Sequence, residues 1–341
     1  PNGDILVTEK GGSVRLVRDG ELIDTPVAVI DDVRTAGQGG LHEIALHPDF
    51  DDNDLVYLSY ARGNDDGSLG TTALVRGRLR NDRIVDIEDI FEAAAWAGTP
   101  GHFGARIAFD GAGHLFMSVG DRMAGFEPDG FTSDVEGHPA QDPSDHRGTI
   151  VRLNLDGSVP ADNPFVDRDG FRPEIWSYGH RNPQGLVFDD ATGQLWSTEH
   201  GPQGGDELNE ILPGRNYGWP VIGYGVNYRV GTEIHPARNR EGMQQPAAFW
   251  VPSIAVSGLA LYRDDEFEPW EGNLFVGGMS AQHQRLSRVM TEGSIVTDRE
   301  ALLAGDYRIR DVRVGPDGLI YLATDNRLGN PTPILRLVPE D

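Results

Sequence analysis

The chain has 341 residues, no cysteine and a formal net charge of −25 at pH 7. The lack of cysteine excludes disulfides and thiolate chemistry, and it leaves the cellular compartment open. The strong negative charge repels nucleic acid and anionic membrane surfaces, so neither is expected as a partner. No apolar run approaches the roughly 18 residues that a membrane-spanning helix needs.

A short pattern recurs six times along the chain, and it predicts the fold. Each copy is a turn residue, then a run of aliphatic and aromatic residues, then small residues, as expected of a tight turn that leads into a buried strand. The copies begin roughly 50 to 80 residues apart, a spacing typical of propeller blades with loops of unequal length. They are residues 3–8, 53–59, 113–118, 193–198, 272–277 and 318–323.

Further strands surround the repeat. Five copies are preceded by another strand that ends in a turn, and we expect the first copy to have lost its preceding strand from the chain. All six copies are followed by an alternating run, which predicts an outer strand with one face in water. The pattern therefore predicts an all-β protein: one six-bladed β-propeller domain over residues 1–341, with four-stranded antiparallel blades. Its site is expected at one end of the central channel.

The segment from Tyr178 to Tyr228 is richer in polar residues and glycine than an ordinary blade loop. Glycines allow backbone carbonyls and amides to come close to a ligand or an ion. Asp206, Glu207 and nearby carbonyls offer the hard oxygen ligands that calcium prefers. The alternative interpretation is a set of turns with solvated acidic side chains.

Other candidate residues lie just before predicted strands. Arg308 and Arg310 occupy alternate positions, so both side chains should point to one face. Two guanidinium groups suit a ligand with several carboxylates, although pairing with acidic side chains of a blade fits the same pattern. His102 has a position from which a histidine can act as a general base near neutral pH. Gln38 lies on a loop that is expected to cover the channel.

These segments, taken in their order along the chain, resemble one family. The chain is similar to the soluble quinoprotein sugar dehydrogenases, which are aldose dehydrogenases that use pyrroloquinoline quinone (PQQ) and are related to soluble glucose dehydrogenase. The resemblance runs over nearly the whole length. The motifs that carry it are residues 37–41, 102–106, 180–185, 201–207, 216–220 and 308–311.

The resemblance implies oxidation of aldose sugars at the anomeric carbon to lactones. His102 would take the proton from the anomeric hydroxyl, while the hydride passes to a quinone carbon of PQQ. Arg181 would polarise the quinone oxygen, whose negative charge grows as the hydride arrives. The other residues implied to bind the cofactor or to line its pocket are Gln38, Asn182, Tyr228, Arg308 and Arg310.

The resemblance also implies calcium. The carbonyls of Gly201 and Pro202 would hold one ion that also contacts PQQ, and Glu207 and Tyr217 would be ligands of a second, structural ion. It further implies an external electron acceptor and a periplasmic or secreted location.

The chain departs from soluble glucose dehydrogenase at two positions. That enzyme has an aspartate just before the histidine, where this chain has Gly101. It also has a cofactor-binding lysine in the fifth blade, whereas the only lysine here is Lys10, so Ser280 or backbone groups are expected to take that role. Both departures indicate the broader aldose dehydrogenase branch.

Two other functions fit the same sequence. One is a catalytically silent propeller that binds carbohydrate. The other is a calcium-dependent hydrolase of the lactonase type, which needs a central calcium held by several side-chain carboxylates and asparagines. The expected use of the Gly201 and Pro202 carbonyls argues against the lactonase.

Overall fold

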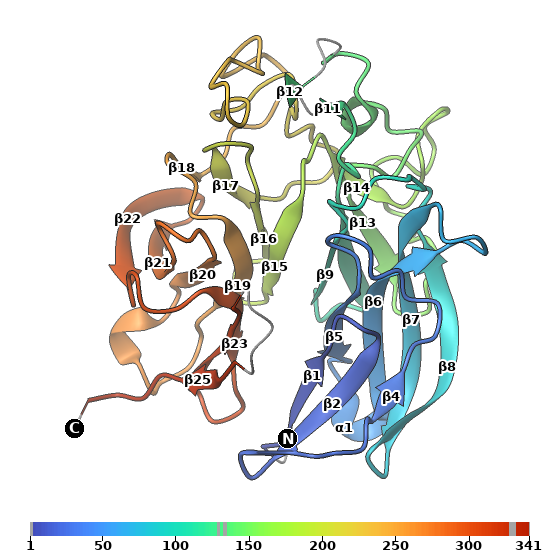
Figure 1. Ribbon diagram of the computed structural model, residues 1–341, viewed down its shortest axis with the longest axis vertical. Helices are drawn as coiled ribbons and strands as arrows, with labels where there is room; N and C mark the ends of the chain where they lie inside the picture. The colour runs from blue at the N-terminus through green and yellow to red at the C-terminus, as the bar shows by residue number, and fades with distance from the viewer. Residues whose placement is uncertain (1–2, 128–129, 132–134, 327–331, 341) are drawn as a thin grey trace. The chain divides into compact units, whose positions relative to one another are not determined.

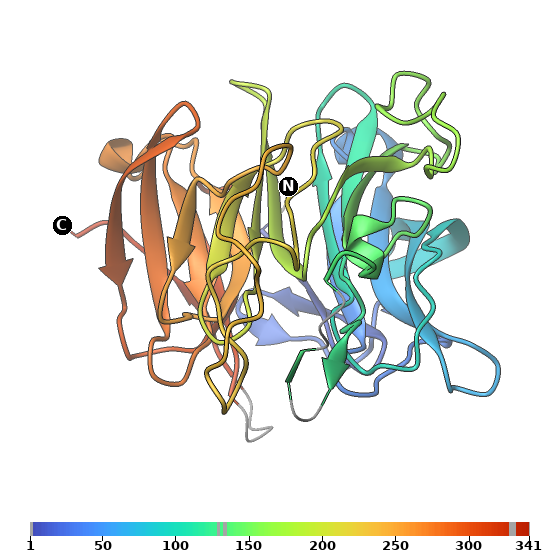
Figure 2. The same ribbon diagram turned by 90° about the horizontal axis from the view of Figure 1, so that it is seen from above.

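The computed structural model describes residues 3–127, 130–131, 135–326 and 332–340. The described chain divides into two compact units. Unit 1 comprises Pro1–Gly125 and Gly137–Asn182, and unit 2 comprises Phe126–Glu136 and Pro183–Asp341. Each unit contains three larger antiparallel sheets, whose strands lie side by side in chain order (Figures 1 and 2).

The sheets of unit 1 follow one another along the chain. The first contains β1 (Ile5–Thr8), β2 (Ser13–Arg18), β3 (Glu21–Leu22) and β4 (Ala28–Val29). The second contains β5 (Leu41–Leu46), β6 (Leu55–Gly63), β7 (Gly70–Arg80) and β8 (Arg83–Glu92), with the short helix α1 (Phe50–Asn53) between β5 and β6. The third contains β9 (Gly104–Phe109), β10 (His114–Val119), β13 (Thr149–Asn154) and β14 (Ile175–Tyr178), with the 3-10 turn η1 (Pro139–Gln141) before β13.

The sheets of unit 2 repeat the arrangement. The first contains β15 (Pro183–Asp189), β16 (Gln194–Glu199), β17 (Asp206–Glu210) and β18 (Ala248–Trp250). The second contains β19 (Val256–Leu261), β20 (Leu274–Gly278), β21 (Arg285–Glu292) and β22 (Ile295–Leu302), with η2 (Glu268–Trp270) before β20. The third contains β23 (Ile309–Val314), β24 (Ile320–Thr324) and β25 (Ile334–Arg336), and β11 (Phe126–Glu127) pairs with β12 (Gly130–Phe131) apart from these sheets.

The predicted repeat is confirmed. Its six copies are β1, β6, β10, β16, β20 and β24, and each is hydrogen-bonded to the strand that follows it. The five strands predicted before the repeat are β5, β9, β15, β19 and β23. The fold class is therefore the predicted six-bladed, antiparallel β-propeller, and its last blade has three strands among the described residues. The location of the site at one end of the channel and the single domain remain predictions.

The prediction that the strand after each repeat is outermost is wrong for five of the six sheets. In these sheets the strand after the repeat is not the last one, and in the first sheet β2 pairs with both β3 and β4. β13 is buried along almost its whole length, because β14 pairs with its free edge. The outermost strands are instead β8, β14, β18 and β22, and β8 and β22 are mostly exposed. Sequence reasoning missed β8 and β22 because their many charged residues hide the apolar run of a buried strand.

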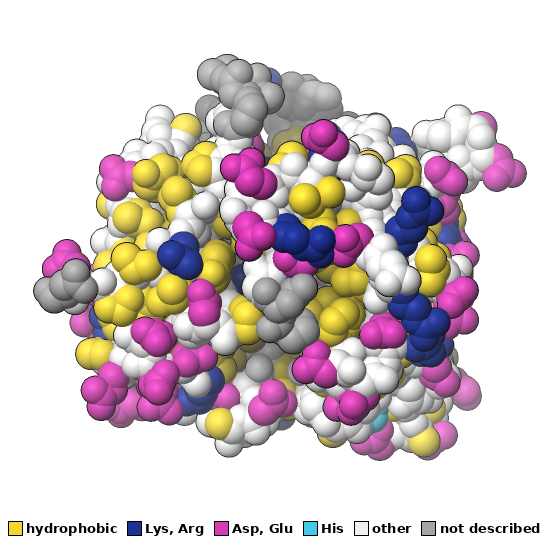
Figure 3. Space-filling view, turned by 90° about the horizontal axis from the view of Figure 1, so that it is seen from below, with side chains coloured by type: hydrophobic (Ala, Val, Ile, Leu, Met, Phe, Trp, Pro, Cys, Tyr) yellow, Lys and Arg dark blue, Asp and Glu magenta, His cyan; other side chains and the backbone are white. Residues whose placement is uncertain are grey.

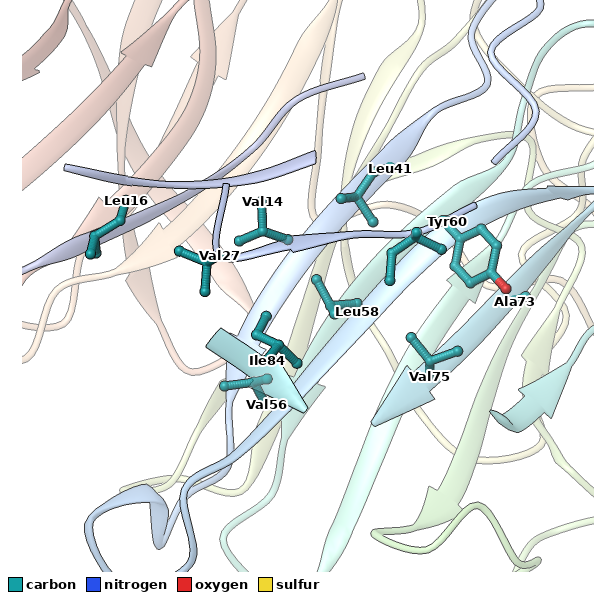
Figure 4. Packing of buried hydrophobic residues seen from close by; sticks show 11 residues of the cluster. Val14, Leu16, Val27, Leu41, Val56, Leu58, Tyr60, Ala73, Val75 and Ile84 are labelled. Atoms are coloured by element: carbon teal, nitrogen blue, oxygen red, sulfur yellow. The ribbon is translucent and has the colours of Figure 1, made fainter. Parts of the chain in front are cut away.

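The core of unit 1 includes a cluster between its first two sheets. Leu58 on β6 lies near Val14 of β2, Val56 of β6 and Ile84 of β8 (Figure 4). Val14, Val56 and Leu58 have no exposed surface. Burial of such side chains is the main favourable term in folding, so this contact joins the two sheets within the unit.

The surface carries the negative charge. Acidic side chains are spread over the face shown in Figure 3, with fewer basic ones among them. Some arginines are paired with more than one acid: Arg18 with Asp4 and Asp82, and Arg62 with three acidic residues. No helix among the described residues has the length and hydropathy needed to cross a membrane.

Replacing Leu58 with alanine should lower the free energy of unfolding by about 2–5 kcal/mol, because the change opens a cavity in a fully buried cluster. The shift of the urea midpoint measures this loss. Leu22→Ala is the matched control, since Leu22 is 53% exposed and its loss should change stability by less than about 0.5 kcal/mol. Equal midpoint shifts for the two variants would contradict the assignment of this core.

Candidate active site

The residues expected to form the site fall in both units. Gln38, His102, Arg181 and Asn182 belong to unit 1. The residues of the group in unit 2 are Gly201, Pro202, Glu207, Tyr217, Tyr228, Ser280, Arg308 and Arg310.

His102 lies two residues before β9 and is almost completely buried. Its backbone has a left-handed conformation, with a φ of 54°. Its amide donates to Gln38 Oε1 at 2.8 Å, and its Nδ1 lies 2.6 Å from Asp121 Oδ1. When Asp121 accepts the Nδ1 proton, the lone pair of the neutral imidazole is on Nε2. The structure thus brings together Gln38 and His102, as predicted, and gives His102 the arrangement of a general base.

Asp121 is a site residue that sequence reasoning missed. It follows β10, and its amide donates to the carbonyl oxygen of Arg181 at 2.8 Å. The sequence predicted both β9 and β10, but it did not reveal the register shift between Met117 and Val119 that decides which residues face each other. Val119 is opposite Gly104 in the register, so two residues further on Asp121 comes opposite His102.

Gly101, where soluble glucose dehydrogenase has an aspartate, lies next to two flexible side chains. A Cβ atom on Gly101 would lie 2.5 Å from the Met123 sulfur and 2.9 Å from Gln38 Oε1, so a larger residue here would require these side-chain ends to move. The carboxylate bonded to His102 is that of Asp121.

The charges around this pair favour a neutral histidine and an ionised aspartate. Burial lowers the pKa of His102, the positive charges of Arg181 and Arg122 lower it further, and Asp121 opposes them. Burial alone would raise the pKa of Asp121, but His102, His138 and Arg181 outweigh it and the pKa is lowered. His102 can therefore accept a proton at neutral pH.

Arg181 and Asn182 immediately precede β15 and are both buried. Asn182 Oδ1 accepts a hydrogen bond from the amide of Gly104 at 3.3 Å. Asn182 thus contacts the start of β9, and Arg181 acts on the pKa of both His102 and Asp121. These three predicted residues, His102, Arg181 and Asn182, form one group in unit 1.

In unit 2, Glu207 faces a second buried carboxylate that the sequence reasoning did not name. Glu199 and Glu207 are opposite each other in the register of β16 and β17. The side-chain nitrogen of Asn209 donates to both, at 3.1 Å each. Burial raises the pKa of Glu207 well above its usual range, and the neighbouring Glu199 and Asp206 raise it further. A bound cation would relieve this repulsion.

The oxygen atoms around this pair fit calcium. Asn209 Oδ1 is buried and accepts no hydrogen bond. Such an orphaned acceptor beside two carboxylates belongs to the set of hard oxygen ligands that calcium prefers. Among the described residues there is no group of three or more histidine, aspartate or glutamate side chains that could hold a metal, so any calcium here also needs amide or carbonyl oxygens.

The other residues expected around calcium have partners of their own. The Tyr217 hydroxyl donates to the carbonyl of Glu210 and accepts from the amide of Leu212, so only its backbone carbonyl is suited to bind an ion. Asp206 is completely buried and accepts from the amide of Gly201 at 3.0 Å. The interpretation of Asp206 as a solvated acid is therefore wrong, because its carboxylate holds the glycine-rich turn that carries the Gly201 and Pro202 carbonyls.

Arg308 and Arg310 both contact Asp325, which follows β24. The prediction that the two side chains share a face is supported by this common partner. Pairing with an acidic side chain, the alternative left open by the sequence, is therefore present. Ser280 donates its amide to the carbonyl of Ile254 at 2.8 Å, and Tyr228 is 43% exposed.

A family model described as Glucose / Sorbosone dehydrogenase matches residues 1–336. The chain belongs to this family. The predicted resemblance to the quinoprotein sugar dehydrogenases is thereby confirmed at the level of the family. The model of the glucose/sorbosone dehydrogenase family covers all the described strands of the chain.

Individual relatives agree with the family. Aldose sugar dehydrogenase YliI of Escherichia coli (strain K12) is 38% identical over 100% of this chain and 88% of its own length. Quinoprotein glucose dehydrogenase B of Acinetobacter calcoaceticus is 34% identical over 81% of this chain and 59% of its own length. The PQQ-bound form of aldose sugar dehydrogenase from Streptomyces coelicolor matches with a TM-score of 0.77 and 28% identity, over 99% of this chain and 91% of that one.

The buried histidines should make folding sensitive to acid. The pKa values of His47, His102 and His138 are lowered by burial. A lowered pKa adds stability above the unfolded value of about 6.5, and this stability is lost as the pH falls through the folded value. We expect the urea midpoint to fall between pH 7 and pH 5.

A variant measures how much His102 contributes to the pH dependence of stability. In His102→Gln the slope of unfolding free energy against pH should be shallower by up to about 1.4 kcal/mol per pH unit, the value for one linked proton. Urea titrations at several pH values measure the slope. An unchanged slope would contradict the lowered pKa of His102.

Proposed function

We propose that this chain oxidises aldose sugars at the anomeric carbon to lactones, with PQQ as the cofactor and calcium as an additional requirement. The observation that carries the proposal is the buried His102–Asp121 pair beside Arg181, in a chain that belongs to the glucose/sorbosone dehydrogenase family. A general base next to a fixed positive charge suits a reaction that removes a proton from a sugar hydroxyl while negative charge forms on an acceptor.

The residues of unit 1 have different roles in the proposed reaction. His102 Nε2 takes the proton of the anomeric hydroxyl, and Asp121 holds the ring in the correct tautomer and stabilises the imidazolium that forms. Gln38 fixes the backbone of His102 through its amide. Arg181 supplies positive charge where the acceptor oxygen becomes anionic. When bound, PQQ supplies the acceptor for the hydride that leaves the anomeric carbon.

Residues of both units have roles in binding. We assign Arg308 and Arg310 to the cofactor carboxylates, because guanidinium groups bind carboxylates in a bidentate manner and the two side chains lie together at Asp325. Asn182, Tyr228 and Ser280 are further candidates for cofactor contacts, with Ser280 in place of a lysine. The carbonyls of Gly201 and Pro202 are assigned to one calcium ion.

Glu207, with Glu199 and Asn209, is assigned to a second calcium ion. The three side chains supply carboxylate and amide oxygens, and the backbone carbonyl of Tyr217 is a further candidate. A sugar, an external electron acceptor and a periplasmic or secreted location complete the proposal.

The two alternative functions have less support. The described residues contain no cluster of several carboxylates of the kind a lactonase-type hydrolase needs. A silent, carbohydrate-binding propeller has no need of an ionised aspartate bonded to a buried histidine. Both alternatives are outcomes of the experiment below.

The test is a titration of chelator-treated protein with PQQ and calcium, followed by a panel of aldoses and an artificial electron acceptor. We expect stoichiometric PQQ uptake and reduction of the dye. Hydrolysis of lactones by calcium-loaded protein without PQQ would favour the lactonase. No PQQ uptake would favour the binding propeller.

His102→Ala should lower kcat by about 100- to 10,000-fold, the usual contribution of a general base, while PQQ still binds. His114→Ala is the matched control. Like His102, His114 has a carboxylate beside Nδ1, with Asp110 Oδ2 at 2.7 Å. His114 lies at the start of β10, whereas the partner of His102, Asp121, follows the end of that strand. Undiminished turnover in His102→Ala, or equal losses in both variants, would overturn the assigned base.

Calcium should raise the melting temperature of chelator-treated protein. At a calcium concentration 100 times the dissociation constant, the gain in stability is about 2.7 kcal/mol. Glu207→Gln should reduce this gain, because it removes one of two facing carboxylates, whereas Glu210→Gln on the same strand should retain it. Thermal melts with and without calcium measure the difference, and an equal calcium response in both variants would contradict the assignment.

A further inference from the structure

We propose that Arg122 is a positioning residue, which holds the segment that carries His102 and supplies a fixed positive charge beside it. The inference rests on the proposed function of His102 as the base. It concerns a side chain that neither the sequence reasoning nor the family assignment singles out.

Arg122 contacts the chain on both sides of His102. Its guanidinium group donates to the carbonyls of Gly101 and Thr99, the latter at 2.9 Å. The same group lies over the ring of Phe103, with 3.4 Å between the guanidinium carbon and the ring centre. A planar cation with several donors can make all these contacts at once, which a lysine cannot.

The backbones of the two segments are also joined. The amide of Arg122 donates to the carbonyl of His102 at 3.3 Å, and the Thr99 hydroxyl donates to the carbonyl of Arg122. Arg122 thus binds residues 99–103 through its main chain and its side chain. Movement of either segment would break several hydrogen bonds together.

The contacts of Arg122 with residues 99–103, here called the clamp, hold a backbone of unusual conformation. His102 and Arg122 both have left-handed conformations, with φ values of 54° and 58°, and Met123 and Ala105 do as well. Residues with a Cβ atom avoid this region, so it persists only where the surroundings impose it. Three of these residues, His102, Arg122 and Met123, lie on the two segments that Arg122 joins, and Ala105 follows the first segment closely.

The charge of Arg122 is unusual for a structural arginine. The side chain has no exposed surface, its bonds go to neutral carbonyls, and its Nε is buried without a partner. Arg152 in the same unit is also buried, but it pairs with Asp162 and lies over Trp176. A buried charge without a bonded counter-ion is costly. We therefore infer that the positive charge of Arg122 acts on the neighbouring His102–Asp121 pair.

Three charged groups act on His102. Asp121 favours its protonation, whereas Arg181 and Arg122 oppose it. Arg122 is in turn surrounded by Arg34, Arg147 and Asp121, and burial with these arginines lowers its pKa to about 9. At pH 7 Arg122 is still a cation, so it helps to keep His102 neutral and able to accept a proton.

Two substitutions separate charge from geometry. Arg122→Lys keeps the charge and loses the clamp, and Arg122→Met loses both. Titration of ring-¹⁵N-labelled histidines by NMR, with His102 assigned from His102→Gln, reports the His102 pKa and tautomer without any cofactor. The kcat and the pH profile of kcat/KM are measured on protein loaded with PQQ and calcium, together with PQQ affinity.

We expect Arg122→Met to raise the His102 pKa and to move the acid limb of kcat/KM to higher pH by the same amount. Arg122→Lys should leave both values close to wild type. Both variants should lose about 100-fold in kcat, the effect of a small misplacement of a catalytic group, with PQQ affinity retained. Arg152→Met should lose stability without these changes. Arg152 contacts His114 at the start of β10, whereas Asp121, the partner of His102, follows the end of that strand.

Several results would overturn the proposal. These are an unchanged His102 pKa in Arg122→Met, an unchanged kcat in Arg122→Lys, or an equal loss of kcat in Arg152→Met. If Arg122→Met does not fold, Arg122→Lys and the wild type still decide the role of the clamp through kcat and the Nδ1–H tautomer. A wild type that takes up PQQ but oxidises no aldose would refute the proposed function, and the NMR titration would still test Arg122.

Discussion

The antiparallel pairing of β9 with β10 is the constraint on which the histidine group depends. The register that places Val119 opposite Gly104 also brings Asp121 opposite His102, where their side chains are 2.6 Å apart. The register, which shifts by one residue between Met117 and Val119, therefore positions a buried carboxylate against a buried imidazole. Beyond the strand ends, the left-handed backbone of His102 and its contacts with Gln38 and Arg122 give the final geometry.

The charges around His102 in unit 1 and around Glu207 in unit 2 are of opposite sign. In unit 1, Arg181 and Arg122 lower the pKa of His102, while Asp121 raises it. In unit 2, Glu199 and Glu207 are opposite each other, and burial and then the charge of Glu199 raise the pKa of Glu207. Two facing carboxylates of this kind suit a divalent cation.

Backbone geometry explains why particular glycines accompany these groups. A Cβ atom on Gly201 would meet the backbone carbonyls of Gly204 and Gly205, which have no room to give way, whereas one on Gly101 would meet the side-chain ends of Met123 and Gln38. In both places the chain folds tightly against a segment that carries a candidate site residue.

The sequence by itself determined the fold class and most of the candidate residues. The six repeats predicted the second strand of five blades and the first strand of the sheet that begins with β1, because a turn followed by an apolar run is a local signal. It did not reveal β8 and β22, whose exposed faces lack that signal, or the pairings of Asp121 with His102 and of Glu199 with Glu207. Those pairings come from strand register, and the burial that shifts their pKa values comes from packing between segments distant in sequence. Only the tertiary structure decided them, because a side chain's partners depend on what the fold brings beside it.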